Sequence, residues 1–470
     1  MLQTIESINN VVNNFIWGVP AMICIIGVGL YLSLRTGFVQ IRKFPYALKT
    51  TLGRIFKKKE ASDGSMTPFQ AVCTALAGTV GTGNIAGVAG AIAIGGPGAV
   101  FWMWVSALLG MCTKFTEVTL AVHFRERNRH GDYVGGPMYY IKNGLGKNWK
   151  FLAVLYSAFG VLTVFGTGNA TQVNTITTAI DTALINFNVI SESSTGRLNL
   201  ILGIVITLLV GMVLLGGIKR IGQVAEFLAP IMCGIYLLVM VIIMIVNAER
   251  IPSVFGSIFA SAFGKDAVFG GIVGSALSWG IKRGFFSNDA GNGMSPLISA
   301  TTDTSHPVKQ GLVQGFSVYV DTLLVCTCTG LSVLLAGTYN VAADGVGDVL
   351  LVEHAKGIQY GIAFMQEAMA TTIGQAGAML LAVILFIFIF TTMLSYSYQL
   401  ESTCKYLFGE NKWVVTFVRI LFLIFCMFGI LIDGDTIWPM GDIGVGCMLW
   451  VNTFSILLLT PVLMRIVKDY

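Results

Sequence analysis

Long apolar runs alternate with short polar stretches along almost the whole chain. Each run has about 20 residues or more, the length that an α-helix needs to cross the hydrocarbon core of a membrane. Residues 357–374 have an amphipathic pattern and are predicted to form a helix outside the membrane core. We predict eleven spans, at approximately 12–34, 66–95, 98–124, 151–180, 198–217, 222–247, 268–300, 308–337, 376–406, 412–432 and 436–466.

Composition agrees with an all-α, polytopic membrane protein. The 470 residues are 55% hydrophobic and 11% charged, whereas a soluble domain carries about 25% charged residues. The chain has no GxxxxGK[ST] phosphate loop, and its four histidines lack metal-ligand spacing. We therefore expect no enzyme, no organic cofactor and no use of ATP, in a multi-pass protein of the cell (plasma) membrane.

Basic residues give the orientation. One set of alternate loops carries 21 of them, and the other set carries four: Arg197, Arg250, Lys265 and Lys356. Because lysine and arginine accumulate in cytoplasmic loops, we expect the N-terminus outside and the C-terminus in the cytoplasm. The run Lys57–Lys59 belongs to the same topology signal, so membrane lipid is an expected partner and nucleic acid is not.

The spans divide into one extra helix and two sets of five. Residues 1–65 hold the extra N-terminal span and a basic cytoplasmic segment, 66–247 hold the first set and 268–466 the second. Since five is odd, the second set crosses the membrane in the opposite sense. This is the geometry of inverted repeats, in which the first helix of each half is broken near the substrate.

Glycine and polar residues interrupt the first span of each half at matching positions. The first contains AGTVGTGNIAG at 77–87, and the second contains SWGIKRGFFSNDAGNG at 278–293. Lys282 and Arg283 are costly at membrane depth unless they face water or a partner. Close helix packing is the other explanation for glycine, and it stays open for Gly87 and Gly90. We predict that both helices are unwound.

Four motifs resemble the alanine or glycine:cation symporters of bacteria and archaea. They are GTVGTGNIAGVA (78–89), GGPGAVFWMWV (95–105), GGPMYYI (135–141) and GIKRGFFSNDAGNG (280–293). The resemblance covers nearly the whole chain and implies a LeuT-type fold that cotransports a small neutral amino acid with sodium or a proton. The chain departs from the family pattern at 287–296, which we expect to lie beyond the second break.

The chemistry of the first break follows from its orphan backbone groups. A broken helix leaves carbonyls at one end and amides at the other. We expect the inner half to end near Ala77 and Val80, whose carbonyls suit a cation. The outer half begins near Thr82, Gly83 and Asn84, where amides and a positive dipole end suit a substrate carboxylate.

The second break is expected to bind the other end of the substrate. Its outer half is predicted to end at Ser275–Trp279, with carbonyls for the substrate ammonium. We expect the side chain to be enclosed further along the same helix. The predicted substrate contacts of this span are Ser275, Ser278, Trp279, Gly280, Ile281 and Phe285.

The resemblance implies the sodium ligands. Positions of the LeuT type map to the carbonyls of Ala77, Val80 and Ile389 and to the hydroxyl of Thr392. The second hydroxyl position of the family is Met393 here, and Thr391 is the expected replacement. A second cation site, close to the substrate, maps to Thr79 and Asn84, which are also candidate substrate contacts.

Further polar residues stand inside spans. Asn169 and Gln172 are one turn apart and are predicted to face the substrate, with interhelical hydrogen bonding as the alternative. Lys114 and Glu117 are three apart and can pair on one helix face, or serve transport. Asp321 suits a relay or a counter-ion for Lys282 or Arg283. Glu401 suits an inner gate.

The sequence therefore predicts secondary active transport. We predict import of alanine or glycine by symport with sodium. A proton is the alternative coupling ion, and a channel is a more distant alternative, because lining polar groups also build pores. The sequence predicts no particular oligomer and is compatible with a monomer.

Overall fold

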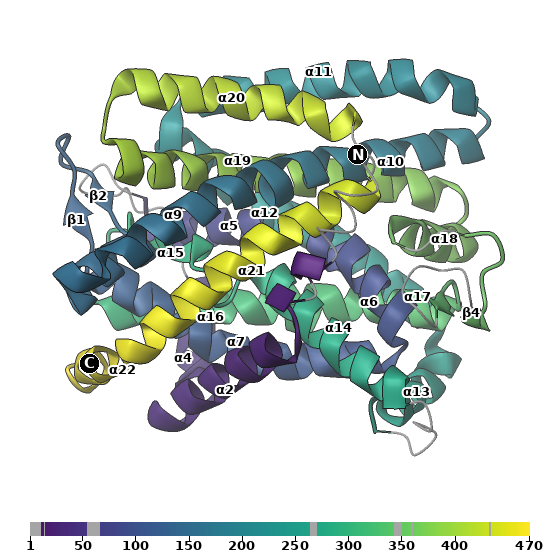
Figure 1. The fold of residues 1–470 in the computed structure, drawn as a ribbon. Helices are drawn as coiled ribbons and strands as arrows, with labels where there is room; N and C mark the ends of the chain where they lie inside the picture. The colour runs from purple at the N-terminus through teal and green to yellow at the C-terminus, as the bar shows by residue number, and fades with distance from the viewer. Residues whose placement is uncertain are drawn as a thin grey trace.

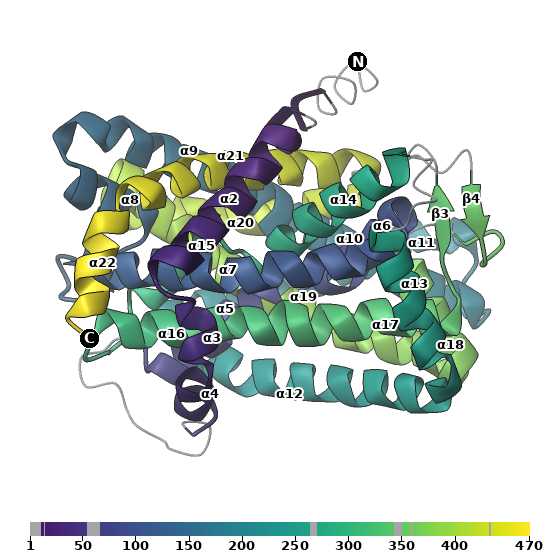
Figure 2. The same cartoon turned by 90° about the horizontal axis from the view of Figure 1, so that it is seen from below.

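The computed structural model describes residues 11–13, 15–53, 66–263, 270–342, 350–358, 361–431 and 434–470. The predicted basic run at 57–59 lies outside these residues. Helices make up most of the described chain, as the apolar periodicity predicts. The first are α2 (Val19–Arg35), α3 (Val39–Arg42) and α4 (Phe44–Leu52). Helix α2 lies obliquely across α7 on the outside of the bundle (Figure 2).

The next helices correspond to the second to sixth predicted spans. Helix α5 begins at a capping box, in which Thr67 Oγ1 accepts from the Gln70 amide at 3.1 Å and Gln70 Oε1 accepts from the Thr67 amide at 3.0 Å. The elements are α5 (Pro68–Thr79), η1 (Gly83–Gly87), α6 (Val88–Gly95), α7 (Gly98–His123), β1 (Glu126–Arg127), β2 (Tyr133–Val134), α8 (Pro137–Tyr140), η2 (Ile141–Leu145), η3 (Lys147–Trp149), α9 (Lys150–Phe165), η4 (Gly166–Ala170), α10 (Thr171–Asn186), η5 (Glu192–Ser194), α11 (Thr195–Leu214) and α12 (Gly217–Val246).

The remaining spans follow in the same way. Strands β1 and β2 pair antiparallel, as do β3 and β4. The elements are η6 (Ala248–Arg250), α13 (Ile251–Phe263), α14 (Gly270–Asn288), α15 (Met294–Ser299), α16 (Pro307–Val318), η7 (Tyr319–Cys326), α17 (Thr327–Ala336), β3 (Asn340–Ala342), β4 (Leu350–Glu353), α18 (Ile362–Ile373), α19 (Ala376–Phe408), α20 (Lys412–Leu431), α21 (Gly434–Leu458) and α22 (Thr460–Lys468). Helix α18 coincides with the predicted amphipathic segment.

Eight helices of the described chain are long and apolar enough to cross a membrane, and a ninth span counts if α5 and the helix after it form one bent span. The multi-pass prediction is thus confirmed, whereas the count of eleven stays a prediction. Most of the long helices run roughly side by side (Figure 1). Helices α13 and α18 and strand β4 lie at one end of the bundle, and β1, β2 and α22 lie at the other.

Burial separates a central helix from peripheral ones. The apolar window of α7 is 83% buried, against 28% for α11 and 22% for α20. Helices α11 and α20 lie side by side along one edge of the bundle (Figure 1). Large apolar side chains such as Leu208 and Phe417 point outward there, whereas buried polar side chains gather inside. This is the arrangement expected of a protein whose solvent is lipid.

Candidate functional site

The first predicted break is present. Helix α5 ends at Thr79 and η1 begins at Gly83, and the helices on either side are bent by 53°. In a continuous helix the Gly81 amide would donate to the Ala77 carbonyl, but here it donates to Asn84 Oδ1 at 2.9 Å. The Ala77 carbonyl is thereby released from the helix ladder. The glycine cluster unwinds the backbone where the sequence predicts it.

A group of neutral oxygens meets at this break. The Thr392 hydroxyl on α19 lies 2.9 Å from the Ala77 carbonyl and 3.4 Å from the Val80 carbonyl. It lies 2.8 Å from the carbonyl of Phe388 on its own helix. The structure therefore brings together the predicted ligands Ala77, Val80 and Thr392, and it adds Phe388, which stands one residue before the predicted Ile389.

The neighbouring hydroxyl points elsewhere. Thr391 Oγ1 donates to the Phe388 carbonyl at 2.9 Å and lies 3.4 Å from Met232 Sδ on α12. Since consecutive residues of a helix are about 100° apart, Thr391 and Thr392 face different neighbours. The side chain of Met393 is fully buried.

The end of the first break is held by a carboxylate. Asn84 Nδ2 donates to Asp321 Oδ1 at 2.7 Å. The other oxygen, Asp321 Oδ2, accepts from Ser287 Oγ at 2.9 Å and from Thr322 Oγ1 at 2.8 Å. All four residues are buried. Asn84 thus meets Asp321, while Thr79 Oγ1 donates to the Leu76 carbonyl at 3.3 Å within α5.

The second break lies farther along the chain than predicted. Helix α14 is continuous from Gly270 to Asn288, so the backbone at 275–279 is helical, and the prediction that it ends there is wrong. The interruption spans Asp289–Gly293, where Asp289, Gly291 and Gly293 have φ of 57°, 86° and 80°. The departures from the family pattern therefore stand at the break itself, not beyond it.

The predicted substrate contacts on α14 lie within the continuous part of this helix. Ser275 Oγ donates to the Ile94 carbonyl at 3.0 Å. Trp279 lies about 13 Å before the end of the helix, at 1.5 Å rise per residue. Six predicted substrate contacts lie in this helical stretch: Ser275, Ser278, Trp279, Gly280, Ile281 and Phe285. Gly280 packs on α7. Ile281 and Phe285 pack in a cluster with Trp17.

The first break approaches the last turn of α14 at Gly83, where it meets Phe286 and Ser287, two residues that are not among the predicted contacts. A Cβ on Gly83 would lie 3.3 Å from Phe286 Cδ1 and 3.4 Å from Ser287 Cα. Two buried polar atoms near this approach, Thr82 Oγ1 and Gln172 Oε1, have no hydrogen-bond partner among the described residues. Because a buried polar atom without a hydrogen-bond partner is costly, a ligand bound here can supply the missing hydrogen bonds.

Gln172 and Asn169 take different roles. A Cβ on Gly81 would lie 3.5 Å from Gln172 Oε1, so this side chain reaches the first break. Asn169 Nδ2 instead donates to the Phe422 carbonyl of α20 at 2.7 Å. That contact is the interhelical hydrogen bond that the sequence leaves open as an alternative.

The two cations of α14 share one buried carboxylate. Lys282 Nζ lies 2.7 Å from Asp442 Oδ2, and Arg283 Nη1 lies 3.3 Å from Asp442 Oδ1. The partner comes from α21, so the interpretation of Asp321 as their counter-ion is wrong. Trp17 Nε1 donates to the Asp442 backbone carbonyl at 2.8 Å, which ties the beginning of the chain to this ion cluster.

The two charges of α7 act on the second break separately. Lys114 and Glu117 form no ion pair with each other among the described residues. Lys114 Nζ donates to the Asn288 carbonyl at 2.6 Å. Glu117 Oε2 accepts from Asn452 Nδ2 at 2.9 Å. The predicted pairing within α7 is thus replaced by contacts to other segments.

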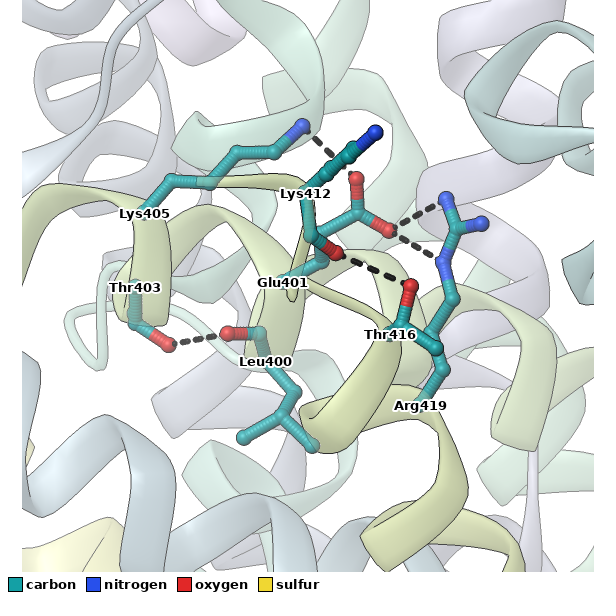
Figure 3. Close-up of polar contacts among 7 residues, drawn as sticks. All are labelled: Leu400, Glu401, Thr403, Lys405, Lys412, Thr416 and Arg419. Atoms are coloured by element: carbon teal, nitrogen blue, oxygen red, sulfur yellow. Dashed lines mark hydrogen bonds and ion pairs between the residues drawn. The ribbon is translucent and has the colours of Figure 1, made fainter. Parts of the chain in front are cut away.

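Glu401 joins two neighbouring helices. Its Oε1 lies 2.7 Å from Lys405 Nζ on the same helix, and its Oε2 accepts from Arg419 Nε and Nη2 on α20 at 2.9 and 2.7 Å (Figure 3). The structure shows Glu401 as a clamp between α19 and α20, and the inner gate stays a prediction.

This clamp gives a first prediction. Glu401→Gln is expected to lower the free energy of unfolding by about 1 kcal/mol, because the ion network is partly exposed. The sodium dependence of uptake is expected to stay unchanged. Thermal unfolding in detergent and sodium titration of uptake check both parts. A large change in sodium affinity with normal stability would instead support a gating role for Glu401.

Comparisons with known proteins bear on the family of the chain. The model of the sodium:alanine symporter family matches residues 2–470. The chain is 37% identical over 466 residues to the sodium/alanine symporter AgcS of Methanococcus maripaludis, covering 99% of this chain and 97% of that protein. It is 39% identical over 419 residues to a sodium/proton-dependent alanine carrier protein of Bacillus sp. PS3, covering 89% and 91%.

A third relative and a solved structure are also similar to this chain. The chain is 34% identical over 475 residues to the probable sodium/glutamine symporter GlnT of Bacillus subtilis, covering 100% of this chain and 91% of that protein. The crystal structure of MhsT in complex with L-phenylalanine matches with a TM-score of 0.54 at 13% identity, over 88% of this chain and 99% of that chain. This likeness shows the LeuT-type fold. The chain belongs to the sodium:alanine symporter family of secondary active transporters.

Proposed function

We propose that the protein imports a small neutral amino acid in symport with sodium. The observation that carries the proposal is the meeting of the Thr392 hydroxyl with the Ala77, Val80 and Phe388 carbonyls. Such oxygens suit a hard cation, and they cannot store a proton near pH 7. No cluster of three or more His, Cys, Asp or Glu side chains that could hold a metal ion occurs among the described residues.

A second cation has a candidate place at Asn84. The amide lies beside the carboxylate of Asp321, which also meets Ser287 and Thr322. A carboxylate can accept either sodium or a proton, so this group is the observation that favours proton coupling as the second candidate function. The name of the Bacillus sp. PS3 relative, a sodium/proton-dependent carrier, points to the same choice of ions.

The substrate is proposed to lie between the two breaks. The amides of Thr82 and Gly83 begin the outer half of the first broken helix and suit a carboxylate. The last turn of α14 supplies carbonyls for the ammonium, in place of those predicted near Ser278. Phe286 faces Gly83 closely, which leaves room for a small side chain. Alanine or glycine fits this space better than glutamine, the substrate that the name of GlnT gives.

The orientation is proposed from charge. Helix α22 and strand β1 lie at the same end of the bundle (Figure 1) and carry basic residues that include Arg465 and Arg127. This end is the cytoplasmic one by the positive-inside rule, which places the C-terminus inside and the N-terminus outside the cell membrane. The two five-helix halves, 66–247 and 268–466, are then inverted repeats.

Gradients imposed on proteoliposomes test the function. Labelled alanine is expected to accumulate when an inward sodium gradient is applied without a proton gradient. Glycine should compete, and leucine should compete poorly. Uptake that follows a proton gradient and ignores sodium would favour the second candidate and make Asp321 the ion site. Single-channel current in place of saturable uptake would indicate a channel.

Enlarging the approach of the two breaks is expected to harm substrate binding. Gly83→Val should raise the KM for alanine about tenfold or more, because the added atoms meet Phe286 and the Ser287 backbone. Gly90→Val is the matched control, since a Cβ on Gly90 has no atom within 4 Å. Equal alanine KM values for the two folded variants would contradict the proposed substrate position.

A further inference from the structure

Three side chains from three helices hold the interrupted end of α14. Lys114 Nζ on α7 donates to the Asn288 carbonyl at 2.6 Å. Asn452 Nδ2 on α21 donates to the Gly291 carbonyl at 2.8 Å, and Tyr156 on α9 donates its hydroxyl to the Asn292 carbonyl at 2.9 Å. All three donors are fully buried. The carbonyls of Asn288, Gly291 and Asn292 are therefore occupied by protein donors.

Charge explains why a lysine stands at this place. A buried ammonium is costly in a membrane protein unless it meets negative charge. The C-terminal end of α14 carries the negative end of its helix dipole, and the Asn288 carbonyl lies at that end. Glu117 lies one turn farther along α7 and reaches the break at the Gly291 backbone and through Asn452, whose amide contacts both Glu117 Oε2 and the Gly291 carbonyl.

The held segment connects directly to the proposed substrate position. Asn288 Nδ2 donates to Thr322 Oγ1 at 3.2 Å, and the preceding residue Ser287 donates to Asp321. Phe286, one residue earlier, faces Gly83. Since these residues are consecutive, a shift of the Asn288 carbonyl displaces the wall of the site.

We propose that Lys114 is a positioning residue that fixes the end of α14 through the Asn288 carbonyl and so sets the affinity for the substrate. Tyr156 supports the same segment from the other side through Asn292. The inference rests on the proposed function, because it concerns the same substrate position. Lys114 would then set the affinity for the substrate without touching it.

A proton-carrying role is the competing explanation. The titratable groups around Lys114 come from six segments, and a pH profile of uptake separates the two roles. These groups are Glu117 on α7, Asp289 in the break, Asp321 in η7, Tyr140 on α8, Tyr156 on α9 and Tyr396 on α19. A positioning residue changes the alanine KM and leaves the shape of the pH profile intact.

The test compares Lys114→Met with Thr116→Val in sodium-driven alanine uptake. Methionine keeps the length of lysine but donates no hydrogen bond, whereas the Thr116 hydroxyl donates within α7, to the Cys112 carbonyl at 2.9 Å. We expect Lys114→Met to raise the alanine KM about tenfold to a hundredfold, since it removes a charge-assisted hydrogen bond. Thr116→Val should leave the KM within about twofold, because it breaks no contact to the break.

A second variant covers the case in which Lys114→Met does not fold. Tyr156→Phe removes only the hydroxyl and should raise the alanine KM about threefold to tenfold. An unchanged KM in the folded variants, or a flattened pH profile in Lys114→Met, overturns the positioning role. Absence of sodium-driven alanine uptake in the wild-type protein overturns the proposed function instead, and the inference with it.

Discussion

Asp442→Asn is expected to lower the free energy of unfolding by about 3–5 kcal/mol, because it leaves two buried cations without their anion. The Asp442 side chain is 2% exposed, and those of Lys282 and Arg283 are 12% and 10% exposed. Aromatic rings line the cluster: Lys282 lies 5.1 Å from the centroid of the Trp279 ring. Such contacts return only part of the lost attraction.

Thermal unfolding of the detergent-solubilised protein measures this effect. The matched control is Asp181→Asn, because Asp181 Oδ2 accepts from a neutral amide, Asn199 Nδ2, at 2.7 Å and no ion pair involves it among the described residues. The control should lose about 1 kcal/mol or less. Equal melting temperatures for the two variants would show that the ion cluster does not stabilise the bundle.

Charge balance offers a further check on the same cluster. In the double variant Lys282→Met/Asp442→Asn, one excess cation is removed along with the anion. We expect it to regain part of the stability that Asp442→Asn loses, since contacting residues do not act additively. A double variant that is less stable than either single variant would mean that packing, and not charge, dominates here.

The first break could be predicted from sequence because glycine and polar residues stand together inside an apolar run. The backbone leaves the helix at Val80 and Gly81, inside the predicted segment 77–87, and the Ala77 and Val80 carbonyls meet Thr392 as expected. Polar and glycine residues in the middle of an apolar run leave few alternatives, since an unpaired backbone in lipid must find partners.

The second break is harder to locate from sequence, because glycine has two roles in membrane helices. A Cβ on Gly280 or Gly284 would collide with α7, so these two allow close helix packing. Gly291 and Gly293 have positive φ and shape the interruption itself. The residue type is glycine at packing positions and at turn positions alike, so only the neighbouring helix or the value of φ distinguishes the two roles.

The partners of the buried charged residues could not be predicted from the sequence either. Arg283 and Asp442 are 159 positions apart, and Lys114 and Asn288 are 174 apart. Spacing on one helix predicts local pairs such as Lys114 with Glu117, but tertiary packing gives each its own partner. On α19 the Thr392 hydroxyl bonds the carbonyl four residues before it, as threonines in helices often do, so the contact falls on Phe388 and not on Ile389.

The neighbouring threonines of α19 allow a direct test of the sodium site. Thr392→Ala is expected to raise the sodium concentration for half-maximal uptake about tenfold or more, because the variant lacks one of the few oxygen ligands. Thr391→Ala is the matched control, since Thr391 Oγ1 points to Met232 on α12 and not to Ala77 or Val80. Both variants remove a hydroxyl that bonds the Phe388 carbonyl, so their effects on helix α19 are similar.

The measurement is alanine uptake into proteoliposomes as a function of sodium, at a fixed membrane potential. Thr392→Ala should shift the half-saturating sodium concentration while uptake at very high sodium approaches the wild-type rate. If both variants shift the sodium curve equally, the hydroxyls act through the structure of α19 and not through the ion. If Thr391→Ala alone shifts the curve, the ion binds toward α12. Either result would remove Thr392 from the site, and with it the main support for sodium at the first break.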